Sequence, residues 1–212
     1  MARPAGVRNQ DFEVKRRVLL QKLTDYALQD GVELPSFRQL AIAAETSEPT
    51  LRHYFSNRSG VVVAIMEYLH DISGYMRDGL SKPDNSIREG LESYHEKLMD
   101  FMRNSRLIVA HAFGIRESMS DAAAREAYLK YLLMPSADAL TEKLAHTEGG
   151  PENHDTAHAA AMMLMSSSLM MILHQELLDG KKHMPIDVDW YLSLVRNWLR
   201  DGLEANPEGL DN

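Results

Sequence analysis

The segment TSEPTLRHYFSNR, residues 46–58, holds the side chains whose chemistry is most distinctive in this sequence. Arg52 and His53 can hydrogen-bond to base edges in the major groove of duplex DNA or to its phosphates. Ser47 is a good helix N-cap, and Pro49 falls in the first turn, where a missing N–H costs little. The segment therefore predicts a short helix that begins at about Ser47 and presents polar side chains to a partner.

A second short helix is expected just before this one, from the N-cap Ser36 to Ala44. Leu51 and Phe55 are four residues apart, so they share one face of the later helix and predict that it packs against its neighbours. Two short helices joined by a tight turn, the second with exposed polar groups, are typical of a helix-turn-helix. The residues predicted to contact DNA are Ser36, Arg38, Ser47, Glu48, Thr50, Arg52, His53, Tyr54 and Arg58.

The charge distribution favours a nucleic-acid contact only in the N-terminal quarter. Residues 1–58 carry nine Lys/Arg and seven Asp/Glu, whereas the rest of the chain carries fourteen and twenty-four. The net charge of the whole chain is -8, but phosphate contacts require only local positive charge. Arg38 and Arg58 are expected to make such contacts.

The composition predicts a soluble protein and is compatible with a reducing compartment. There is no cysteine, so disulfides are excluded. The N-terminal residues lack the apolar run of a signal peptide. The longest uncharged stretch, residues 159–173, is shorter than the roughly 20 apolar residues of a membrane span. We therefore expect a cytoplasmic protein without a membrane partner.

Helical periodicity runs through almost the whole chain, and no segment shows convincing strand alternation. The predicted fold is all-α, with a small helix-turn-helix head, residues 1–58, and a larger helical body, residues 59–212. Pro135 is expected to kink or split its helix. The first expected helix runs from about Phe12 and ends near Gly31. The other expected helices cover residues 36–44, 47–55, 57–80, 87–103, 106–117, 121–145, 153–178 and 188–203.

The stretch FRQLAIAAETSEPTLRHYFSNRSGVVVAIM resembles the N-terminal motif of the tetracycline-repressor (TetR/AcrR) family. The resemblance implies that the third helix enters the major groove and that the body binds a ligand and dimerises. It also implies that the last two helices pair with their symmetry mates as a four-helix bundle. The matching residues are Leu40, Ala41, Ala44, Ser47, Thr50, Leu51, His53, Tyr54, Phe55 and Arg58.

Two residues depart from the family's pattern. Glu45 stands in the turn where family members usually have Gly, which predicts either a strained residue at positive φ or a different turn. Arg52 stands where they often have Tyr and exchanges a phenol for a forked cation, so the resemblance implies no operator sequence. Glu48 could accept a hydrogen bond from cytosine N4. We interpret the chain as a homodimeric transcriptional repressor that a small organic effector releases from a palindromic operator.

Residues 159–178 are apolar on two sides, so one side is expected in the core and the other against a partner subunit. The sequence leaves open which side has which role. The first stripe contains Ala160, Ala161, Leu164, Ser168, Met171 and Gln175. The second contains Met162, Met163, Ser166, Leu169, Met170, Leu173 and Leu177. In the last helix, Leu199 is expected on the surface that meets the partner.

The ligand site is expected to be a mainly apolar cavity with a few orienting hydrogen bonds. The helix from about Asn57 to Leu80 is expected to act as a lever that transmits effector binding to the head. Arg116 and Glu117 are expected to be an exposed pair of little energetic weight. The candidate ligand-binding residues are Met66, Tyr94, Met99, Met102, His111, Phe113, Tyr128, Met165 and His174.

Two other functions are compatible with the sequence. His154 and His158 are four apart and could share a metal in an all-α enzyme, with His111 or His174 as a further ligand. Their spacing lacks the glutamate base of the zinc-protease motif, so no metal, cofactor or catalytic residue is predicted. The other alternative is a constitutive DNA-binding protein, whose body would be packed without a cavity.

Overall fold

The structure, a computed structural model, describes residues 5–29, 31–104 and 106–205, without the side chains of residues 5–9 and 102–104. The described residues are largely helical and contain no strand, which confirms the predicted all-α class. The chain divides into two compact units. The first contains the chain up to Ile72 together with Val109–Leu132. The second contains Ser73–Ile108 and the chain from Leu133.

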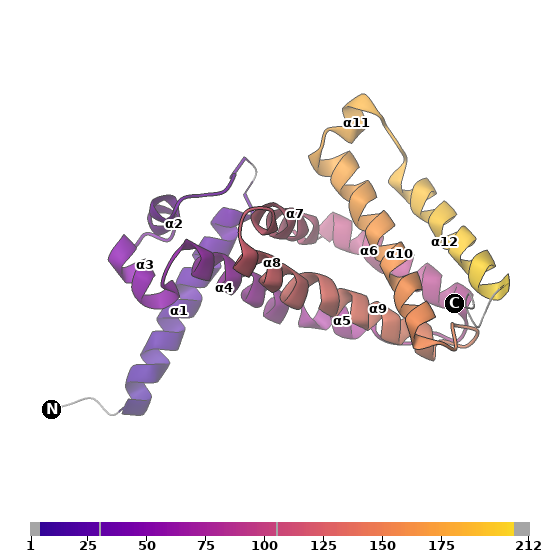
Figure 1. The fold of residues 1–212 in the computed structure, drawn as a ribbon, viewed down its shortest axis with the longest axis horizontal. Coiled ribbons are helices and arrows are strands. Elements are labelled where there is room, and N and C mark those ends of the chain that lie inside the picture. Colours follow the sequence, from indigo (N-terminus) through magenta and orange to yellow (C-terminus); the bar gives the residue numbers. More distant parts are fainter. Residues whose placement is uncertain (1–4, 30, 105, 206–212) are drawn as a thin grey trace. The chain divides into compact units, whose positions relative to one another are not determined.

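The first unit is built on the helices of the head (Figure 1). α1 packs against α2 and α4, α3 packs against α2 and α4, and α4 packs against α8. Leu51 and Phe55 of α3 are buried as predicted, and Leu23, Leu40 and Ile65 complete the centre of this core. The helices are α1 (Ala5–Ala27), α2 (Phe37–Ala43), α3 (Glu48–Phe55), α4 (Arg58–Ile72), α7 (Leu107–Ser118, from Val109 onward in this unit) and α8 (Ala122–Tyr128).

The predicted N-caps of α2 and α3 are present. The Ser36 hydroxyl accepts a hydrogen bond from the Gln39 N–H at 3.3 Å, and the Gln39 side chain accepts one from the Ser36 N–H at 2.8 Å. This reciprocal capping box satisfies two donors that the helix itself leaves unpaired. The Ser47 hydroxyl accepts from the Thr50 N–H at 3.2 Å. Local side-chain chemistry therefore sets where both helices begin.

The turn between α2 and α3 places a non-glycine residue in the left-handed region. Glu45 has φ 53°, so of the two alternatives that the sequence left open the turn has the strained residue at positive φ. Its N–H donates to the Ile42 carbonyl at 2.9 Å, and the Thr46 N–H donates to the Ala41 carbonyl at 2.9 Å. These two bonds form a Schellman motif, the helix ending that usually carries glycine at this position. α2 therefore ends in a tight, hydrogen-bonded turn despite the side chain of Glu45.

The prediction of one helix from residue 57 to residue 80 is wrong. α4 ends at Ile72, and α5 (Gly74–Leu80) begins after Ser73, which has φ -98° and ψ 7°. Serine competes with the helix for backbone hydrogen bonds, and glycine is a poor helix former. The Ser73 hydroxyl also accepts a hydrogen bond from the Arg77 guanidinium at 2.7 Å. The break coincides with the boundary between the units, so no continuous helical lever runs to Leu80.

The helix expected over residues 121–145 is split, as was predicted from Pro135. A π-helical segment, η1 (Leu129–Leu133), separates α8 from α9 (Met134–His146), whose second residue is Pro135. Proline has no N–H to donate to the carbonyl four residues earlier, which belongs to Tyr131. His70 Nδ1 donates to that carbonyl oxygen at 3.0 Å. A side chain of α4 thus provides a hydrogen bond that the proline cannot.

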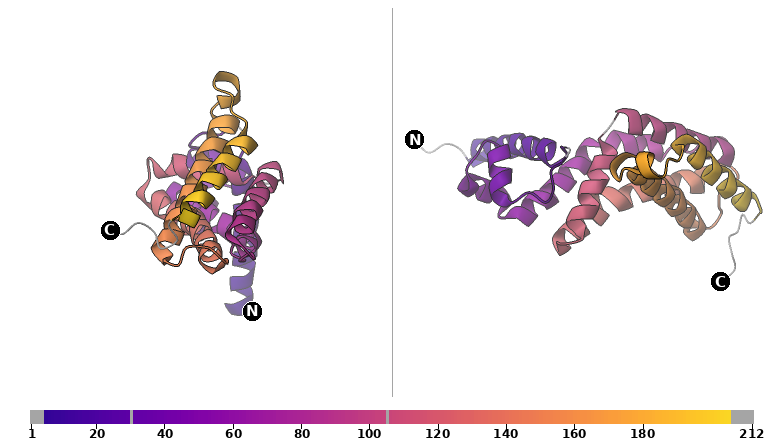
Figure 2. Two further views of the ribbon diagram at one scale, coloured as in Figure 1. Left: turned by 90° about the vertical axis from the view of Figure 1, so that its right-hand side faces the viewer. Right: turned by 90° about the horizontal axis from the view of Figure 1, so that it is seen from above.

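The second unit is a bundle of longer helices. α10 packs against α9 and α12, and α12 packs against α6. α10 and α12 run in opposite directions and are joined at one end through α11 (Figures 1 and 2). The centre includes Leu91, Leu140, Leu144 and Leu164. The helices are α5, α6 (Ile87–Asn104), α9, α10 (His154–Ile172), η2 (Leu173–Leu177, π-helical), α11 (Gly180–His183) and α12 (Val188–Ala205).

The two stripes of α10 and η2 differ in burial. Every residue of the first stripe, from Ala160 to Gln175, is buried. In the second stripe Met163 is 61% exposed and Met170 is 63% exposed. The segment is long and apolar enough to cross a membrane by length and composition, but the buried stripe is part of the core of this unit. The first stripe is therefore the inward one.

The position expected for Leu199 is wrong. Leu199 of α12 is 9% exposed and packs in the core with Leu164 and Leu203. Its neighbour Trp198 is 69% exposed. Adjacent residues of a helix differ by about 100° in direction, so only one of the two can face the core. Trp198 is the outward residue of this pair.

Candidate nucleic-acid interface

Aromatic contacts fasten α3 to the first half of α1. The ring centroid of Phe12 lies 4.7 Å from that of Tyr54 and 5.6 Å from that of His53. Tyr54 is half-buried, whereas His53 is exposed. Such ring contacts restrict orientation in addition to burying apolar area. Tyr54 therefore helps to hold α3, and His53 keeps an accessible imidazole whose ring is oriented by Phe12.

Arg52 is exposed on α3, but two contacts restrict the position of its guanidinium. Its carbon lies 5.1 Å from the centroid of the Phe37 ring in α2. One of its nitrogens, Nη1, donates to the Ser56 carbonyl at 3.4 Å. Stacking of a planar guanidinium on an aromatic ring orients its fork of donors. The stacking on Phe37 therefore limits the directions in which the Arg52 guanidinium can donate hydrogen bonds to a partner.

The other predicted DNA contacts lie on the same two helices. Thr50 is exposed, and its hydroxyl oxygen lies 2.8 Å from that of Ser47. Glu48 is half-buried in the first turn of α3. Ser36 and Arg38 are exposed at the start of α2. Apart from Arg58, the structure thus brings the predicted residues onto the helix-turn-helix.

Arg58, the first residue of α4, makes its contacts inside the protein. Its Nη1 and Nη2 donate to the two carboxylate oxygens of Glu117 at 2.9 and 2.8 Å. Its Nε donates to the Pro35 carbonyl at 2.7 Å. Glu117 is fully buried, so the expected exposed Arg116–Glu117 pair is wrong. These contacts differ from the phosphate contact expected for Arg58.

The junction of α3 and α4 is a strained turn. Ser56 has φ 66° and ψ -57°, and the Asn57 N–H donates to the Phe55 carbonyl at 2.7 Å. This is a γ-turn of the rare form with positive φ. A Cβ on Gly60 would lie 2.0 Å from the Phe55 carbonyl oxygen, so a side chain there would force the turn apart. The junction therefore holds α3 closely against the start of α4.

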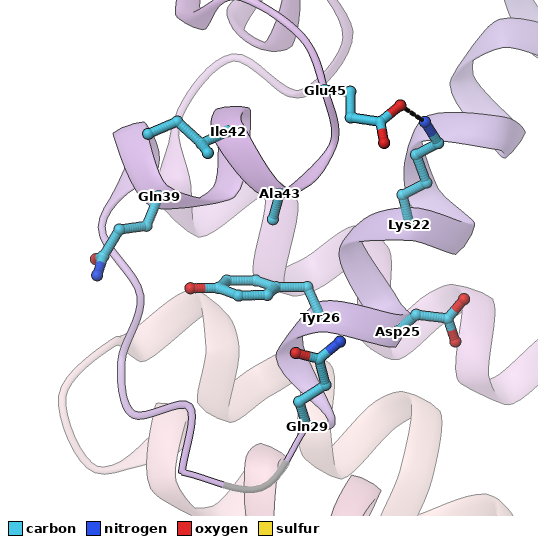
Figure 3. A pocket seen from close by; sticks show the side chains of 8 residues that line it. All are labelled: Lys22, Asp25, Tyr26, Gln29, Gln39, Ile42, Ala43 and Glu45. Carbon is cyan, nitrogen blue, oxygen red and sulfur yellow. Dashed lines mark hydrogen bonds and ion pairs between the residues drawn. The ribbon is translucent and has the colours of Figure 1, made fainter.

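A surface groove of about 370 Å³ lies between α1 and α2 (Figure 3). The Tyr26 side chain extends from α1 toward α2 within it. At one edge Lys22 donates to the Glu45 carboxylate, and this hydrogen bond lowers the pKa of Glu45. The ion pair gives the strained residue of the turn a partner on α1. The other lining residues are Asp25, Gln29, Gln39, Ile42 and Ala43.

The predicted ligand-binding residues are distributed over both units. Met66, His111, Phe113 and Tyr128 are buried in the first unit. His111 Nδ1 lies 3.1 Å from the Tyr128 hydroxyl. Burial lowers the pKa of His111 to about 4 and raises the pKa of Tyr128 to about 12. This pair is therefore neutral at neutral pH.

In the second unit the buried Tyr94 hydroxyl donates to the Ser168 hydroxyl at 3.3 Å, and burial raises the pKa of Tyr94 to about 12. The cavity beside them has a volume of about 10 Å³, room for about one water molecule. Three further candidates in this unit, Met99, Met165 and His174, are half-buried. The side chain of the last candidate, Met102, lies outside the described residues.

His154 and His158, the pair considered for a metal site, lie in different environments. His154 is exposed at the start of α10, and His158 Nδ1 lies 3.2 Å from the Thr141 hydroxyl. Among the residues that the structure describes, no group of three His, Asp or Glu side chains could hold a metal ion. The metal-dependent enzyme therefore gains no support from this pair.

Three solved structures with 11–19% sequence identity share this fold. A TetR-family transcriptional regulator from Mesorhizobium loti has a TM-score of 0.60 and 11% identity, over 90% of this chain and 97% of its own. A transcriptional regulator from Pseudomonas aeruginosa has a TM-score of 0.61 and 19% identity, over 95% and 93%. The fatty acid degradation regulator FadR from Bacillus halodurans has a TM-score of 0.60 and 15% identity, over 89% and 96%.

No protein-family model and no curated protein matches the sequence. Because the sequence identities are only 11–19%, the similarity to these three structures is a similarity of fold. The chain has the fold of TetR-family transcriptional regulators, which confirms at this level the resemblance seen in residues 37–66.

Proposed function

We propose that this protein is a homodimeric DNA-binding transcriptional regulator whose α3 reads an operator in the major groove. The observation that carries the proposal is the construction of the helix-turn-helix. Leu51 and Phe55 anchor one side of α3, while Thr50, Arg52 and His53 are exposed on it. A rigid helix with donors and acceptors on one side is what major-groove readout requires.

The second unit supports dimerisation. Met163, Met170 and Trp198 are each more than half exposed on α10 and α12. Met163 and Met170 are seven residues apart and so lie on one face of α10, and exposed apolar surface of this kind marks sites of association. A two-fold dimer through these helices would present two copies of α3 to a near-palindromic operator. The second stripe of α10 is thus the proposed partner surface.

A repressor of this kind would be released by a small organic effector bound by its helices, in the cytoplasm. Since α4 ends at Ile72, we assign the signal to contacts inside the first unit. There the candidate residues Met66, His111 and Tyr128 belong to α4, α7 and α8, which share a unit with the head. By linkage, operator DNA must weaken effector binding by the same factor by which the effector weakens DNA binding.

Selection of bound sequences from random duplexes, at a stated salt concentration, tests the proposal. The selected sites should form a near-palindrome. Arg52→Ala and His53→Ala should each lower affinity and change which base is preferred at the contacted position. Arg88→Ala, at an exposed residue of α6, is the matched control. If both α3 variants kept the affinity and the base preference of the wild type, α3 would not be the reading helix.

A further inference from the structure

Arg58 and Glu117 join helices that are distant in the sequence. The guanidinium and the carboxylate face each other with two parallel hydrogen bonds, a geometry that is both strong and directional. The Glu117 side chain is fully buried, whereas that of Arg58 is 28% exposed. Removing one partner of such a pair leaves a buried charge without compensation. The last turn of α7 is therefore held firmly against the first residue of α4.

The third contact of Arg58 extends this link to the helix-turn-helix. Its Nε donates to the carbonyl of Pro35, the residue before the N-cap of α2, Ser36. The preceding residue, Leu34, has φ 27°, a conformation that bulky side chains rarely adopt. A strained residue persists only where its surroundings hold it in place. The Arg58 contact is one such restraint, and it holds in place the segment that leads into the capped start of α2.

A second carboxylate meets the first turn of α4. The pKa of Asp121, the N-cap of α8, is lowered mainly by a hydrogen bond from the Ser59 side chain, with further contributions from its own helix and from Arg58. Carboxylates are favoured at a helix N-terminus, where they complement the helix dipole. Glu117 and Asp121 thus both interact with side chains of the first turn of α4, Glu117 with Arg58 and Asp121 mainly with Ser59.

We propose that Glu117 is a positioning residue for DNA binding: through Arg58 it holds the Pro35 carbonyl and so the segment that leads into α2. The inference rests on the proposed function. In this proposal Glu117, which lies outside the helix-turn-helix, controls the position of α2. It also assigns Arg58 to the internal framework of the head instead of to a phosphate.

Two variants test the inference against the phosphate role. Glu117→Gln keeps the shape but removes the charge that Arg58 requires. Arg58→Lys keeps a cation that could still contact a phosphate, but it loses the fork that joins Glu117 to Pro35. Glu126→Gln, at an exposed residue of α8, is the control with the same change in net charge. Each variant is titrated with the duplex selected by the wild type at several salt concentrations.

We expect Glu117→Gln and Arg58→Lys each to bind the selected duplex about 10-fold more weakly, with an unchanged salt slope. The control should bind like the wild type. In hydrogen exchange without DNA, amides of residues 36–40 should exchange faster in both variants than in the control. Circular dichroism shows whether Glu117→Gln remains folded; if it does not, Arg58→Lys decides alone.

Wild-type affinity in Arg58→Lys would overturn the inference, and equal or tighter binding by a folded Glu117→Gln would in addition identify Arg58 as a phosphate contact. Unchanged exchange at residues 36–40 in both variants would also overturn it. Failure of the wild type to bind any duplex would instead reject the proposed function. The exchange measurement would then still report whether Glu117 positions α2.

Discussion

The guanidinium of Arg52 in α3 lies over the ring of Phe37 in α2, 5.1 Å from its centroid. The contact joins the two helices of the helix-turn-helix through a side chain that is expected to read DNA. Phe37 thus supports Arg52 in addition to packing α2. A base-reading side chain gains specificity when its orientation is set before the partner arrives.

Phe37→Leu should therefore weaken binding to the selected duplex by about 2- to 5-fold, the value of an exposed cation–π contact. The leucine keeps an apolar side chain at the start of α2 but offers no ring to stack on. In the Arg52→Ala background the same change should have a smaller effect. A double-mutant cycle measured by fluorescence anisotropy checks the coupling; equal losses in both backgrounds would mean that the ring does not orient Arg52.

Trp198→Glu should convert a dimer into a monomer without unfolding the chain, because Trp198 is 69% exposed on α12. Leu199→Ala should instead destabilise the fold by about 2 to 5 kcal/mol, as expected for a buried leucine. Sedimentation and thermal unfolding separate the two effects. Dimeric Trp198→Glu protein, at micromolar concentration, would place the partner surface elsewhere.

Glu45→Gly should raise the melting temperature relative to Glu45→Ala by about 2 to 4 °C, since only glycine adopts this left-handed conformation without strain. Both variants remove the ion pair with Lys22, so their difference isolates the backbone effect. Differential scanning calorimetry measures it. Equal melting temperatures would show that the turn relaxes when the side chain is shortened.

The stability of the protein should fall between pH 6.5 and pH 4 because of His111. Burial lowers the pKa of His111 to about 4, so in this window the unfolded chain binds a proton that the folded chain does not. The free energy of unfolding then decreases by up to about 1.4 kcal/mol for each pH unit of acidification.

His111→Gln should remove this contribution, and Tyr128→Phe should retain it, because it leaves the imidazole buried. Urea unfolding of each variant at pH 7 and pH 5 gives the slopes. A His111→Gln protein that loses as much stability as the wild type over this interval would contradict the assignment.

Features that depend on neighbouring residues were predictable from the sequence. The caps Ser36 and Ser47 and the split near Pro135 follow from local backbone chemistry, whereas for Glu45 the sequence left two turns open. The break at Ser73 was missed because the apolar spacing continues across it, through Ile72, Met76 and Leu80. Periodicity reports which face is apolar, but it does not detect a single turn in which the helix is interrupted.

Contacts between distant residues were not predictable. Arg58 and Glu117 are 59 residues apart, and the sequence offered no reason to pair them. The same is true of Phe37 beneath Arg52, where the stacking depends on how α2 and α3 meet. For α10 both stripes were recognised, but only the packing of α9 and α12 against it decides which is buried. In the same way, the sequence did not show that of the neighbours Trp198 and Leu199 only Leu199 faces the core.

Changing the spacing between the half-sites of the selected duplex tests the central claim most directly. A two-fold dimer that places two copies of α3 on one face of DNA requires half-sites about one helical turn apart. Inserting about 5 base pairs rotates one half-site to the opposite face, and the affinity should fall on the order of 100-fold. Inserting the same length outside the two half-sites should leave it unchanged. Equal affinity for the original duplex and the duplex with the internal insertion would contradict a dimeric regulator that reads its operator through α3.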